Sequence, residues 1–194
     1  INRLGNWVLR PIFDNACGFK EGLARVCVNG KFGFIDLKGD WVVGAIFAQG
    51  CDFSEGMAAV EVDNKWGYIN CKGEWAIKPI YDKAMNFFNG VAAIGINKKW
   101  GYIDTQGNET APVAFSKASN YYENLACVKL GGKEGYINHE GTWLVAPIFD
   151  WGGNFSEGLA SVKVDAKYGY INRDKIWDPS EEELFFKNVP GRFS

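Results

Sequence analysis

Hydrophobic and polar residues alternate with a period of two in many short stretches of this chain. In LARVCV, at residues 23–28, small or branched side chains occupy every second position. Because successive side chains of a β-strand point to opposite faces, this alternation predicts a strand. Asn29–Gly30 follows, and both residues of this dipeptide accept the positive φ angles of a tight hairpin turn. The pattern therefore predicts a β-hairpin whose second strand runs through Ile35.

The hairpin pattern recurs every 34 residues, with an isoleucine at its end and a glycine two positions earlier. The isoleucines are Ile1, Ile35, Ile69, Ile103, Ile137 and Ile171, and the glycines are Gly33, Gly67, Gly101, Gly135 and Gly169. Helix-pair repeats can share this period, but the local period of two excludes them. We therefore expect a repeat array over residues 1–177, with units 1–34, 35–68, 69–102, 103–136 and 137–170 and a partial unit 171–177.

Each unit is predicted to hold three antiparallel strands. After the hairpin, residues 36–39 have the chemistry of a type I turn, since the Asp36 side chain can accept backbone amides and Gly39 takes the exit. A third strand starts at Trp41, and its proline-containing equivalents should lie at a sheet edge or bend. The predicted fold is all-β: tandem three-stranded meanders stacked in an open, twisted, solenoid-like array. A closed propeller-like ring is the alternative, disfavoured because a propeller blade needs four strands and ~40 residues.

The glycine of each hairpin indicates a close approach by another group. In the predicted register Gly33 faces Val26, on the face that carries small and branched side chains. Glycine inside a strand usually marks such an approach, because it leaves a notch where a side chain would be. We expect a large ring from the same or the next unit to fill this notch. The best candidates are the tryptophans that start the third strands: Trp7, Trp41, Trp75 and Trp143.

Several motifs in the same register resemble the WG-repeat family of mainly bacterial proteins. They are KWGYI at 65–69 and 99–103, PIFD at 11–14 and 147–150, and FSEGLA at 155–160. The first, fourth and fifth units depart from the literal WG pair, with Phe32, Glu134 and Tyr168 in place of tryptophan. The resemblance implies an all-β repeat module whose usual presumed role is interaction or scaffolding. It implies no catalytic residues.

The residues that could support catalysis or metal binding have simpler structural explanations. His139 is the single histidine, and its position in a tight turn predicts a solvated side chain. A recurring glutamate precedes Gly or Asn in a turn, where capping of backbone amides is the expected role. These glutamates are Glu21, Glu55, Glu123 and Glu157. Alternation of Asp36 with asparagine in other units disfavours a calcium turn. We predict no enzyme activity, no metal and no cofactor.

The charge limits the classes of partner that are expected, and the cysteines indicate the cellular compartment. The formal net charge is −2, from 21 basic and 23 acidic residues without long runs of either sign, so neither nucleic-acid binding nor membrane insertion is expected. Five cysteines without a CxxC motif favour a reducing, cytoplasmic compartment. Cys17 and Cys51 occupy equivalent positions, where a bridge would need close Cα atoms. The chain begins inside a repeat, so we expect it to be part of a longer protein. If that protein has a leader before this sequence, a secreted or cell-surface location replaces the cytoplasmic one.

Three aromatic residues are candidate contacts for a protein partner. Trp151 occupies a loop position that is polar in every other unit, which is typical of a partner anchor, although packing against the C-terminal tail explains it equally. Tyr121 and Tyr122 belong to the unit that departs most from the others, and we expect them to be exposed unless the unit has simply drifted. The predicted function is a non-catalytic module for protein–protein interaction. The alternative is an array whose tryptophans stack on glycans or choline-like groups.

The repeat register ends after Trp177. In DPSEEELFFKN, Ser180 lies three residues before Glu183, the spacing of a helix capping box, and apolar residues follow. We therefore expect residues 178–194 to form a capping segment with a short helix, since a terminal repeat must cover its exposed face.

Overall fold

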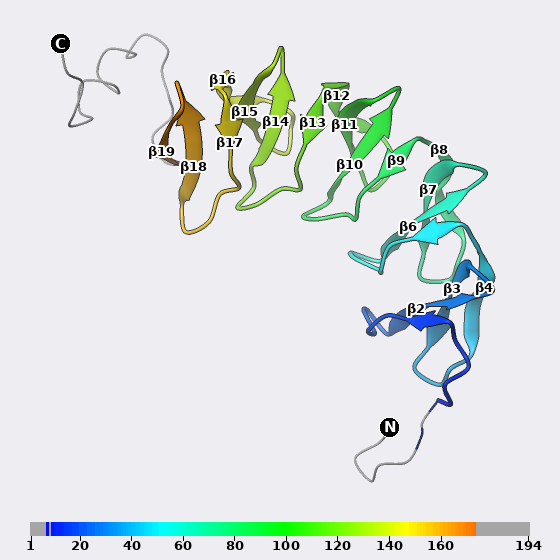
Figure 1. The fold of residues 1–194 in the computed structure, drawn as a ribbon. Coiled ribbons are helices and arrows are strands. Elements are labelled where there is room, and N and C mark those ends of the chain that lie inside the picture. The colour runs from blue at the N-terminus through cyan, green and yellow to red at the C-terminus, as the bar shows by residue number, and fades with distance from the viewer. Residues whose placement is uncertain (1–6, 8, 174–194) are drawn as a thin grey trace, which may run out of the picture.

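The computed structural model describes residue 7 and residues 9–173, which form five antiparallel β-sheets and no helix. The sheets follow one another along an open, curved array whose ends do not meet (Figure 1). The open array of antiparallel β repeats is therefore confirmed, and residues 9–173 do not close into a ring. The expected capping helix at 178–194 lies outside the described residues.

Four of the sheets have four strands each, in sequence order or its reverse. The first holds β1 (Asn15–Ala16), β2 (Leu23–Val28), β3 (Lys31–Asp36) and β4 (Trp41–Phe47). The second holds β5 (Gln49–Gly50), β6 (Met57–Val62), β7 (Lys65–Asn70) and β8 (Trp75–Tyr81), and the third holds β9 (Lys83–Ala84), β10 (Val91–Ile96), β11 (Lys99–Asp104) and β12 (Glu109–Phe115). The fourth holds β13 (Lys117–Ala118), β14 (Ala126–Leu130), β15 (Lys133–Ile137) and β16 (Trp143–Phe149). The last described sheet holds β17 (Trp151–Gly152), β18 (Leu159–Val164) and β19 (Lys167–Asn172).

The predicted meander is present in the first four sheets, and the structure adds a two-residue strand at the opposite edge. This strand, for example β5, pairs with the first strand of the hairpin through Gln49 and Gly50. Two residues are too few to show an alternating pattern, so the sequence carries no sign of it. The sheets span 15–47, 49–81, 83–115, 117–149 and 151–172, and therefore begin about midway through the units defined on isoleucines.

The turn chemistry predicted from the sequence is confirmed. Asn29 and Gly30 have φ angles of 51° and 72°, and the least typical pair, Asp165–Ala166, still adopts 47° and 64°. After the first hairpin, the Asp36 carboxylate accepts the backbone N–H groups of Lys38, at 2.8 Å, and of residue 40, at 2.9 Å. The equivalent side chains of residues 70, 104 and 138 accept amides at the same two offsets.

The ring expected against each hairpin glycine is not there, and this prediction is wrong. A Cβ atom built on Gly67 would lie 2.6 Å from the Ile77 carbonyl oxygen, a backbone atom of the third strand. The corresponding distances to the third strand are 2.6 to 2.9 Å at Gly33, Gly101 and Gly135. The cause is a shift of register in the antiparallel pairing of β7 with β8 between Trp66 and Tyr68, where the backbone of residues 77–79 bulges over Gly67.

The tryptophans that start the third strands lie largely at the surface. Trp7, Trp41 and Trp75 are 64%, 46% and 41% exposed, so they do not have the buried position that filling the notch would give them. Trp75 touches the edge of the Phe47 ring of the preceding sheet, with centroids 6.2 Å apart, and Trp143 meets the ring of residue 115 in the same way at 5.9 Å. These rings therefore join neighbouring sheets instead of filling the glycine notch.

The hydrophobic core lies between consecutive sheets. One cluster joins Phe34 of the first sheet to Ala58, Val60 and Ile69 of the second. Thus the aromatic face of one hairpin packs on the small, branched face of the next, which is why the two faces of each strand differ. A single unit of this kind buries little apolar surface on its own, as expected for a repeat array.

We predict that Gly67→Ala lowers the free energy of unfolding by roughly 1–3 kcal/mol, because the new methyl group must displace backbone. Urea denaturation followed by tryptophan fluorescence measures the change. Gly44→Ala is the matched control, since Gly44 also lies in a strand but a Cβ atom there meets nothing within 4 Å. Equal losses of stability in the two variants would contradict the role assigned to the glycine notch.

Candidate functional site

Tight turns that precede each hairpin line the inner side of the curved array (Figure 1). We call them the inner-edge turns: residues 20–23, 54–57, 88–91, 122–125 and 156–159. In the first of them, Lys20 and Leu23 exchange backbone hydrogen bonds of 2.8 and 2.9 Å, and the two residues between them have positive φ. Such a turn fixes the backbone of its first residue.

The recurring glutamates hold successive inner-edge turns together. The Glu21 carboxylate accepts the N–H groups of Glu55 and Gly56 at 2.8 and 2.9 Å. Glu55 in turn accepts the N–H groups of Asn89, at 2.5 Å, and Gly90, at 2.7 Å. The expected capping of backbone amides is therefore present at Glu21 and Glu55, but each of these carboxylates caps the next unit and not its own turn.

The series of carboxylates is interrupted in the third unit, where asparagine replaces glutamate. The Asn89 side chain donates to the Asn124 side-chain oxygen at 3.4 Å. The series resumes with Glu123, which accepts the Gly158 N–H at 2.9 Å and lies 3.7 Å from the Arg173 guanidinium. A pair of neutral amides thus lies between the third and fourth inner-edge turns.

Buried tyrosines form a second set of contacts between units. The hydroxyl of Tyr102 donates to the Ser119 carbonyl oxygen at 2.6 Å, and Tyr68 and Tyr136 make the same contact with carbonyls 17 residues further on. Burial raises the pKa of the Tyr102 hydroxyl, so it remains a donor. Each ring also packs on a ring 19 residues later, with centroids 4.7 to 5.0 Å apart. The first unit has Phe34 here and makes the ring contact alone.

Tyr121 is one of these core rings, and its predicted exposure is wrong. It is 1% exposed, packs on Tyr102 and donates its hydroxyl to the Asn138 carbonyl oxygen at 3.0 Å. The sequence does contain the signal, because Tyr121 shares its repeat position with Phe53, Phe87 and Phe155, all of which are buried.

Tyr122 is 40% exposed, as predicted, and it has an aromatic neighbour that sequence reasoning missed. Phe88, at the same position of the preceding inner-edge turn, is 44% exposed, and the two ring centroids are 6.4 Å apart. The other units have Lys20, Ser54 and Ser156 at this position. Comparing the units at the position of Tyr122 would have revealed Phe88 as a second aromatic residue there. We call Phe88 and Tyr122 the inner-edge aromatic pair.

Trp151 lies at the other end of the strands. It starts β17, is 40% exposed, and pairs across the sheet with Lys163. Its ring meets the edge of the Tyr168 ring at 6.1 Å, and the Lys163 ammonium lies 5.5 Å from the centre of the same ring. Because Tyr122 is in a turn before a hairpin and Trp151 is beside the hairpin turn, the structure does not bring these two candidates together.

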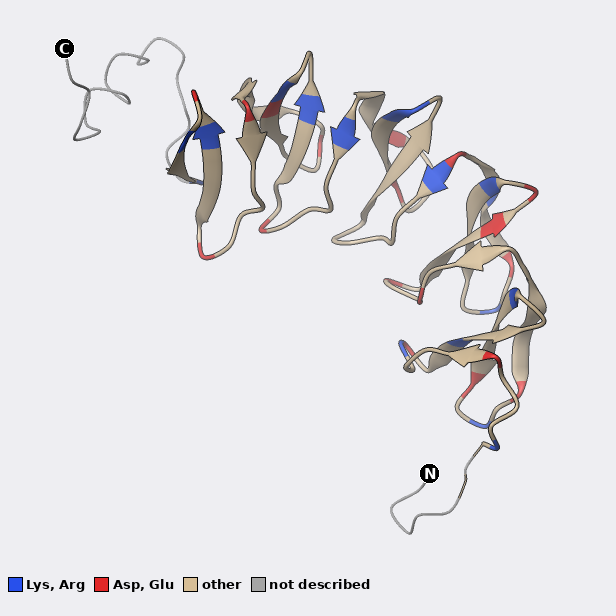
Figure 2. Ribbon diagram, in the orientation of Figure 1, with Lys and Arg blue, Asp and Glu red and all other residues tan. Residues whose placement is uncertain are grey.

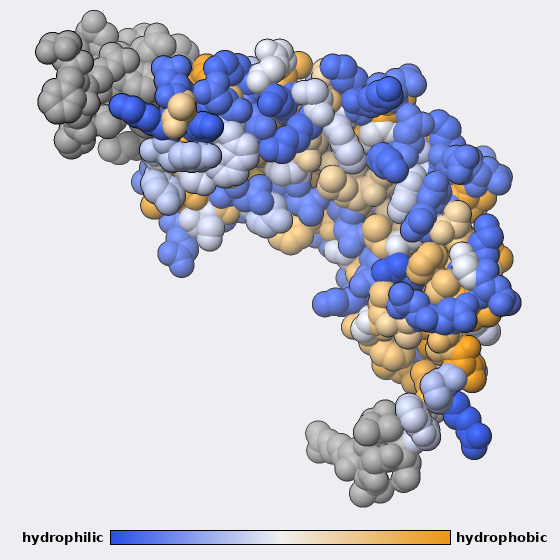
Figure 3. Space-filling view, in the orientation of Figure 1, coloured by the Kyte–Doolittle hydropathy of each residue, from blue (hydrophilic) through white to orange (hydrophobic). Residues whose placement is uncertain are grey.

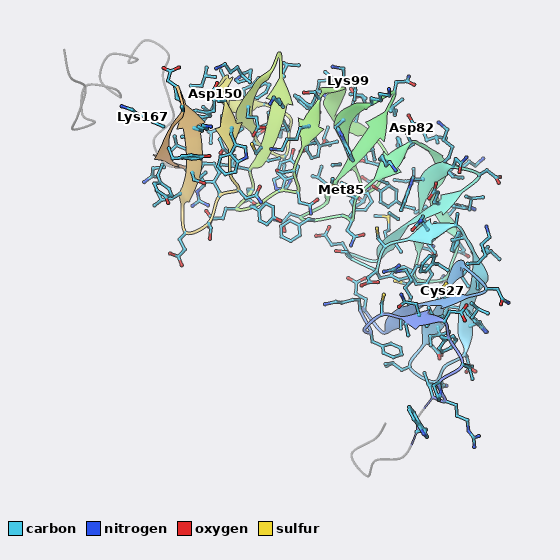
Figure 4. The ribbon with its side chains drawn as sticks, viewed as in Figure 1. Cys27, Asp82, Met85, Lys99, Asp150 and Lys167 are labelled. Atoms are coloured by element: carbon cyan, nitrogen blue, oxygen red, sulfur yellow. The ribbon has the colours of Figure 1, made fainter. Side chains whose placement is uncertain are left out.

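Hairpin turns and their ion pairs occupy the outer edge of the array. Asp82 and Asp150 lie there, whereas Met85 lies toward the inner side (Figure 4). The Lys65 ammonium is 2.5 Å from the Asp82 carboxylate, which also accepts the Asn97 N–H at 2.7 Å. The hydrogen bond from Lys65, followed by that from the amide, lowers the pKa of Asp82. Basic and acidic positions alternate along the described strands and turns, without a long run of either sign (Figure 2).

Glu134 is a buried carboxylate in the position that holds a ring in the other units. It is 2% exposed, lies 3.0 Å from the Lys117 ammonium and accepts the Gly152 N–H at 2.9 Å. The Cys127 thiol also donates to it, at 3.4 Å. Burial and then the neighbouring carboxylate raise the pKa of Cys127 to about 12. A thiol held protonated in this way is a poor nucleophile, so the cluster has the character of an internal ion pair.

His139 does not have the solvated position predicted for it. Its ring stacks on Tyr121, with centroids 4.2 Å apart and planes 16° from parallel, and both ring nitrogens are buried without a hydrogen-bond partner. Desolvation lowers its pKa, which favours the neutral ring. Stacking on Tyr121 therefore accounts for the position of His139.

All five cysteines are free, so the bridge considered between Cys17 and Cys51 is not formed. In residues 7 and 9–173, no group of three or more His, Cys, Asp or Glu side chains is placed to hold a metal ion. The same residues include no helix with the length and apolar character needed to cross a membrane.

We expect Tyr102→Phe to lower the free energy of unfolding by about 1–2 kcal/mol, because the Ser119 carbonyl loses its partner between two units. Tyr122→Phe removes an exposed hydroxyl and serves as the control, with no expected change. Urea titration of both proteins provides the comparison. A fully stable Tyr102→Phe protein would show that the hydroxyl contact does not contribute to the junction.

Comparison with known proteins bears on both sequence and fold. The family model described as "WG containing repeat" matches five successive stretches, residues 1–32, 32–66, 66–100, 100–133 and 135–168. No curated protein matches the chain. Among solved structures, Hsv2p of Kluyveromyces lactis is similar at a TM-score of 0.54 and 11% identity, over 93% of this chain and 68% of that one. A eukaryotic initiation factor is similar at a TM-score of 0.51 and 12% identity, over 82% of this chain and 52% of that one. At such identities the likeness concerns the fold alone.

Proposed function

Because the chain belongs to the WG-containing repeat family, we propose that it is a non-catalytic binding module that holds a protein partner on the inner edge of its array. The observation that carries the proposal is the inner-edge aromatic pair. Phe88 and Tyr122 are large, exposed rings side by side at a position that is lysine or serine in every other unit. A repeat that keeps its core while changing one surface position in two adjacent units has the pattern of a local contact site.

Aromatic side chains in a fixed geometry are effective anchors at protein interfaces. They bury a large area while losing little side-chain entropy. Phe88 begins a turn whose next two N–H groups are held by the Glu55 carboxylate. Tyr122 begins a turn in which its own N–H donates to the Leu125 carbonyl at 2.8 Å. Both rings therefore project from backbone that is ordered before a partner arrives.

The surroundings of the pair favour a polypeptide partner. Asn89 follows Phe88 directly and Asn124 lies two residues after Tyr122; their side chains meet at 3.4 Å and offer further amide donors and acceptors. Such groups suit the backbone of an extended peptide, while the rings suit its apolar side chains. Trp151, at the outer edge, is proposed as a separate contact, since the distance along the strands prevents it from sharing this site.

The glycan alternative rests on Trp41 and Trp75, which are 46% and 41% exposed. Trp41 contacts Phe13, which precedes the first sheet, and Trp75 contacts Phe47 of the first sheet. These contacts already account for the positions of the two rings. Tryptophan fluorescence during titration with neutral sugars and with choline distinguishes the two functions. Quenching that disappears in Trp41→Ala and Trp75→Ala would favour the alternative.

The test of the proposed function compares proteins captured by the parent chain with those captured by Phe88→Ser/Tyr122→Ser. Serine is the natural residue at this position in two other units, so the fold should be retained. We expect partner affinity to fall about tenfold or more, the usual effect of removing an interface anchor. Ile80→Ser is the matched control, because Ile80 is also exposed, at 59%, but lies in a third strand. An unchanged set and affinity of captured proteins would refute the inner-edge site, and Trp151→Gln tests the outer contact in the same assay.

A further inference from the structure

The charged residues of the turns are divided unevenly between the two edges of the array. The inner-edge turns carry one lysine, Lys20, against four glutamates, which are Glu21, Glu55, Glu123 and Glu157. The hairpin turns at the outer edge carry lysines in every unit, namely Lys31, Lys65, Lys98, Lys99, Lys133 and Lys167, against Asp63 and Asp165. Figure 2 shows acidic residues at the tips of the inner turns and basic residues on strands closer to the outer edge. The inner-edge turns therefore have a net negative charge.

The type I turns that follow each hairpin lie beside the inner-edge turns. In the second sheet the Cys71 thiol donates to the Gly56 carbonyl oxygen at 3.4 Å, which joins the two kinds of turn. In the fourth sheet the His139 ring stacks on Tyr121, which immediately precedes Tyr122 in the chain. The charges of the type I turns therefore act at the inner edge as well.

One position of the type I turns loses its basic residue in the two sheets that carry the inner-edge aromatic pair. The first two sheets have Lys38 and Lys72 at this position, whereas the third and fourth sheets have Gln106 and Glu140. In the third and fourth sheets, neither the inner-edge turn nor the type I turn beside it contains a lysine or an arginine. The exposed rings and the loss of positive charge thus occur together.

Glu55 brings a further negative charge to the third inner-edge turn. Its carboxylate accepts the two N–H groups that follow Phe88, at 2.5 and 2.7 Å. Within the described part of the chain, no lysine, arginine or histidine forms an ion pair with Glu55. Desolvation lowers the pKa of His139, and the Glu55 carboxylate opposes this shift. The field of Glu55 therefore extends from the third inner-edge turn to the ring that stacks on Tyr121.

The two rings of the inner-edge aromatic pair are not stacked on each other. Their centroids are 6.4 Å apart and their planes are inclined by 35°, so each ring keeps a face for a partner. The face of an aromatic ring attracts a cation through its quadrupole, and a planar guanidinium can also stack on it. Polar and apolar residues lie side by side along the inner side of the array (Figure 3). The pair therefore offers an apolar surface that also favours positive charge.

We propose that the inner-edge aromatic pair holds a basic segment of its protein partner, which places an arginine or lysine side chain over Phe88 or Tyr122. The cation is attracted by the faces of the two rings and by the carboxylates around them at the same time. This inference rests on the proposed function, because it names the chemistry of the partner that is held at that same site.

Charge complementarity distinguishes a basic segment from an apolar or an acidic one. An apolar side chain would cover the rings, but it would take water from the nearby carboxylates without supplying a counter-charge, which costs free energy. An acidic side chain would be repelled by the same carboxylates. A lysine or arginine covers the rings with its methylene groups and brings the opposite charge with its head group. Because salt screens exposed charges, we expect the affinity to fall as the ionic strength rises.

Selection from a library of random short peptides displayed on phage, with the parent chain as bait, tests the proposal. We expect the enriched sequences to contain arginine or lysine and to be lost when Phe88→Ser/Tyr122→Ser is the bait. Fluorescence anisotropy of a labelled synthetic copy of the enriched peptide then measures its affinity. Citrulline in place of its arginine, or norleucine in place of its lysine, removes the charge from a side chain of similar length. We expect this replacement to weaken binding about tenfold or more.

Charge variants of the protein test the contribution of the acidic surroundings. Gln106→Lys/Glu140→Lys restores the lysines of the first two sheets, and we expect it to bind the basic peptide about fivefold more weakly or worse. The control Asp63→Asn/Asn64→Lys/Ala166→Lys adds the same net positive charge at the outer edge and should bind like the parent. Each replacement is the natural residue at the same repeat position of another unit, so the fold should be retained.

The possible outcomes separate this inference from the proposed function. Enriched peptides that lack a cationic side chain but no longer bind Phe88→Ser/Tyr122→Ser would overturn the inference and leave the proposed function standing. Equal affinities of the charged peptide and its neutral analogue would overturn it too, as would equal affinities of the parent and Gln106→Lys/Glu140→Lys. A library that yields no peptide dependent on the two rings would refute the inner-edge site itself.

Discussion

The fold depends on one contact, in which an aromatic ring of each of the first four hairpins packs on a ring of the next unit at 4.7 to 5.0 Å. A single unit is a small twisted sheet with an apolar surface on each side, and it cannot bury either surface alone. The ring contact lets each unit bury its apolar surface against the next unit. Tyrosine hydroxyls and glutamate carboxylates that bond to the next unit support this contact. The tryptophans for which the repeat is named contribute less to this core than tyrosine and phenylalanine do.

Those parts of the fold that arise from local chemistry could be predicted from the sequence. Asn29–Gly30 specifies its turn through backbone preference, and Asp36 specifies the next turn through its own carboxylate. The partner of Gly67 could not be predicted, because it is set by a register shift in β7–β8 pairing that side-chain patterns do not encode. A glycine leaves room equally well for a large ring or for the backbone of another strand. The sequence therefore predicts the space beside Gly67 but not the group that fills it.

The residues of the candidate site could likewise be predicted from the sequence only in part. Tyr121 and Tyr122 are neighbours in the chain, yet one is 1% and the other 40% exposed, since successive residues of extended backbone face opposite ways. Register comparison across units assigns Tyr121 to the core and identifies Phe88 as the neighbour of Tyr122. What could not be read from the sequence is that these turns lie on the inner side of the curve, because curvature arises from how whole sheets pack. The buried Glu134, with Lys117 beside it, shows that the array tolerates an ion pair in place of a ring.

The spacing of the contacts also bears on how such a chain comes to be folded. The side-chain hydrogen bonds that join neighbouring units link residues 17 to 35 apart. Contacts of such short range have a small loop-closure cost, and each can form as soon as the second unit has been synthesised. The array can therefore be assembled from one end during translation, each newly emerged unit being completed on the one before it. An insertion of a unit by gene duplication would lengthen the array without disturbing any contact elsewhere.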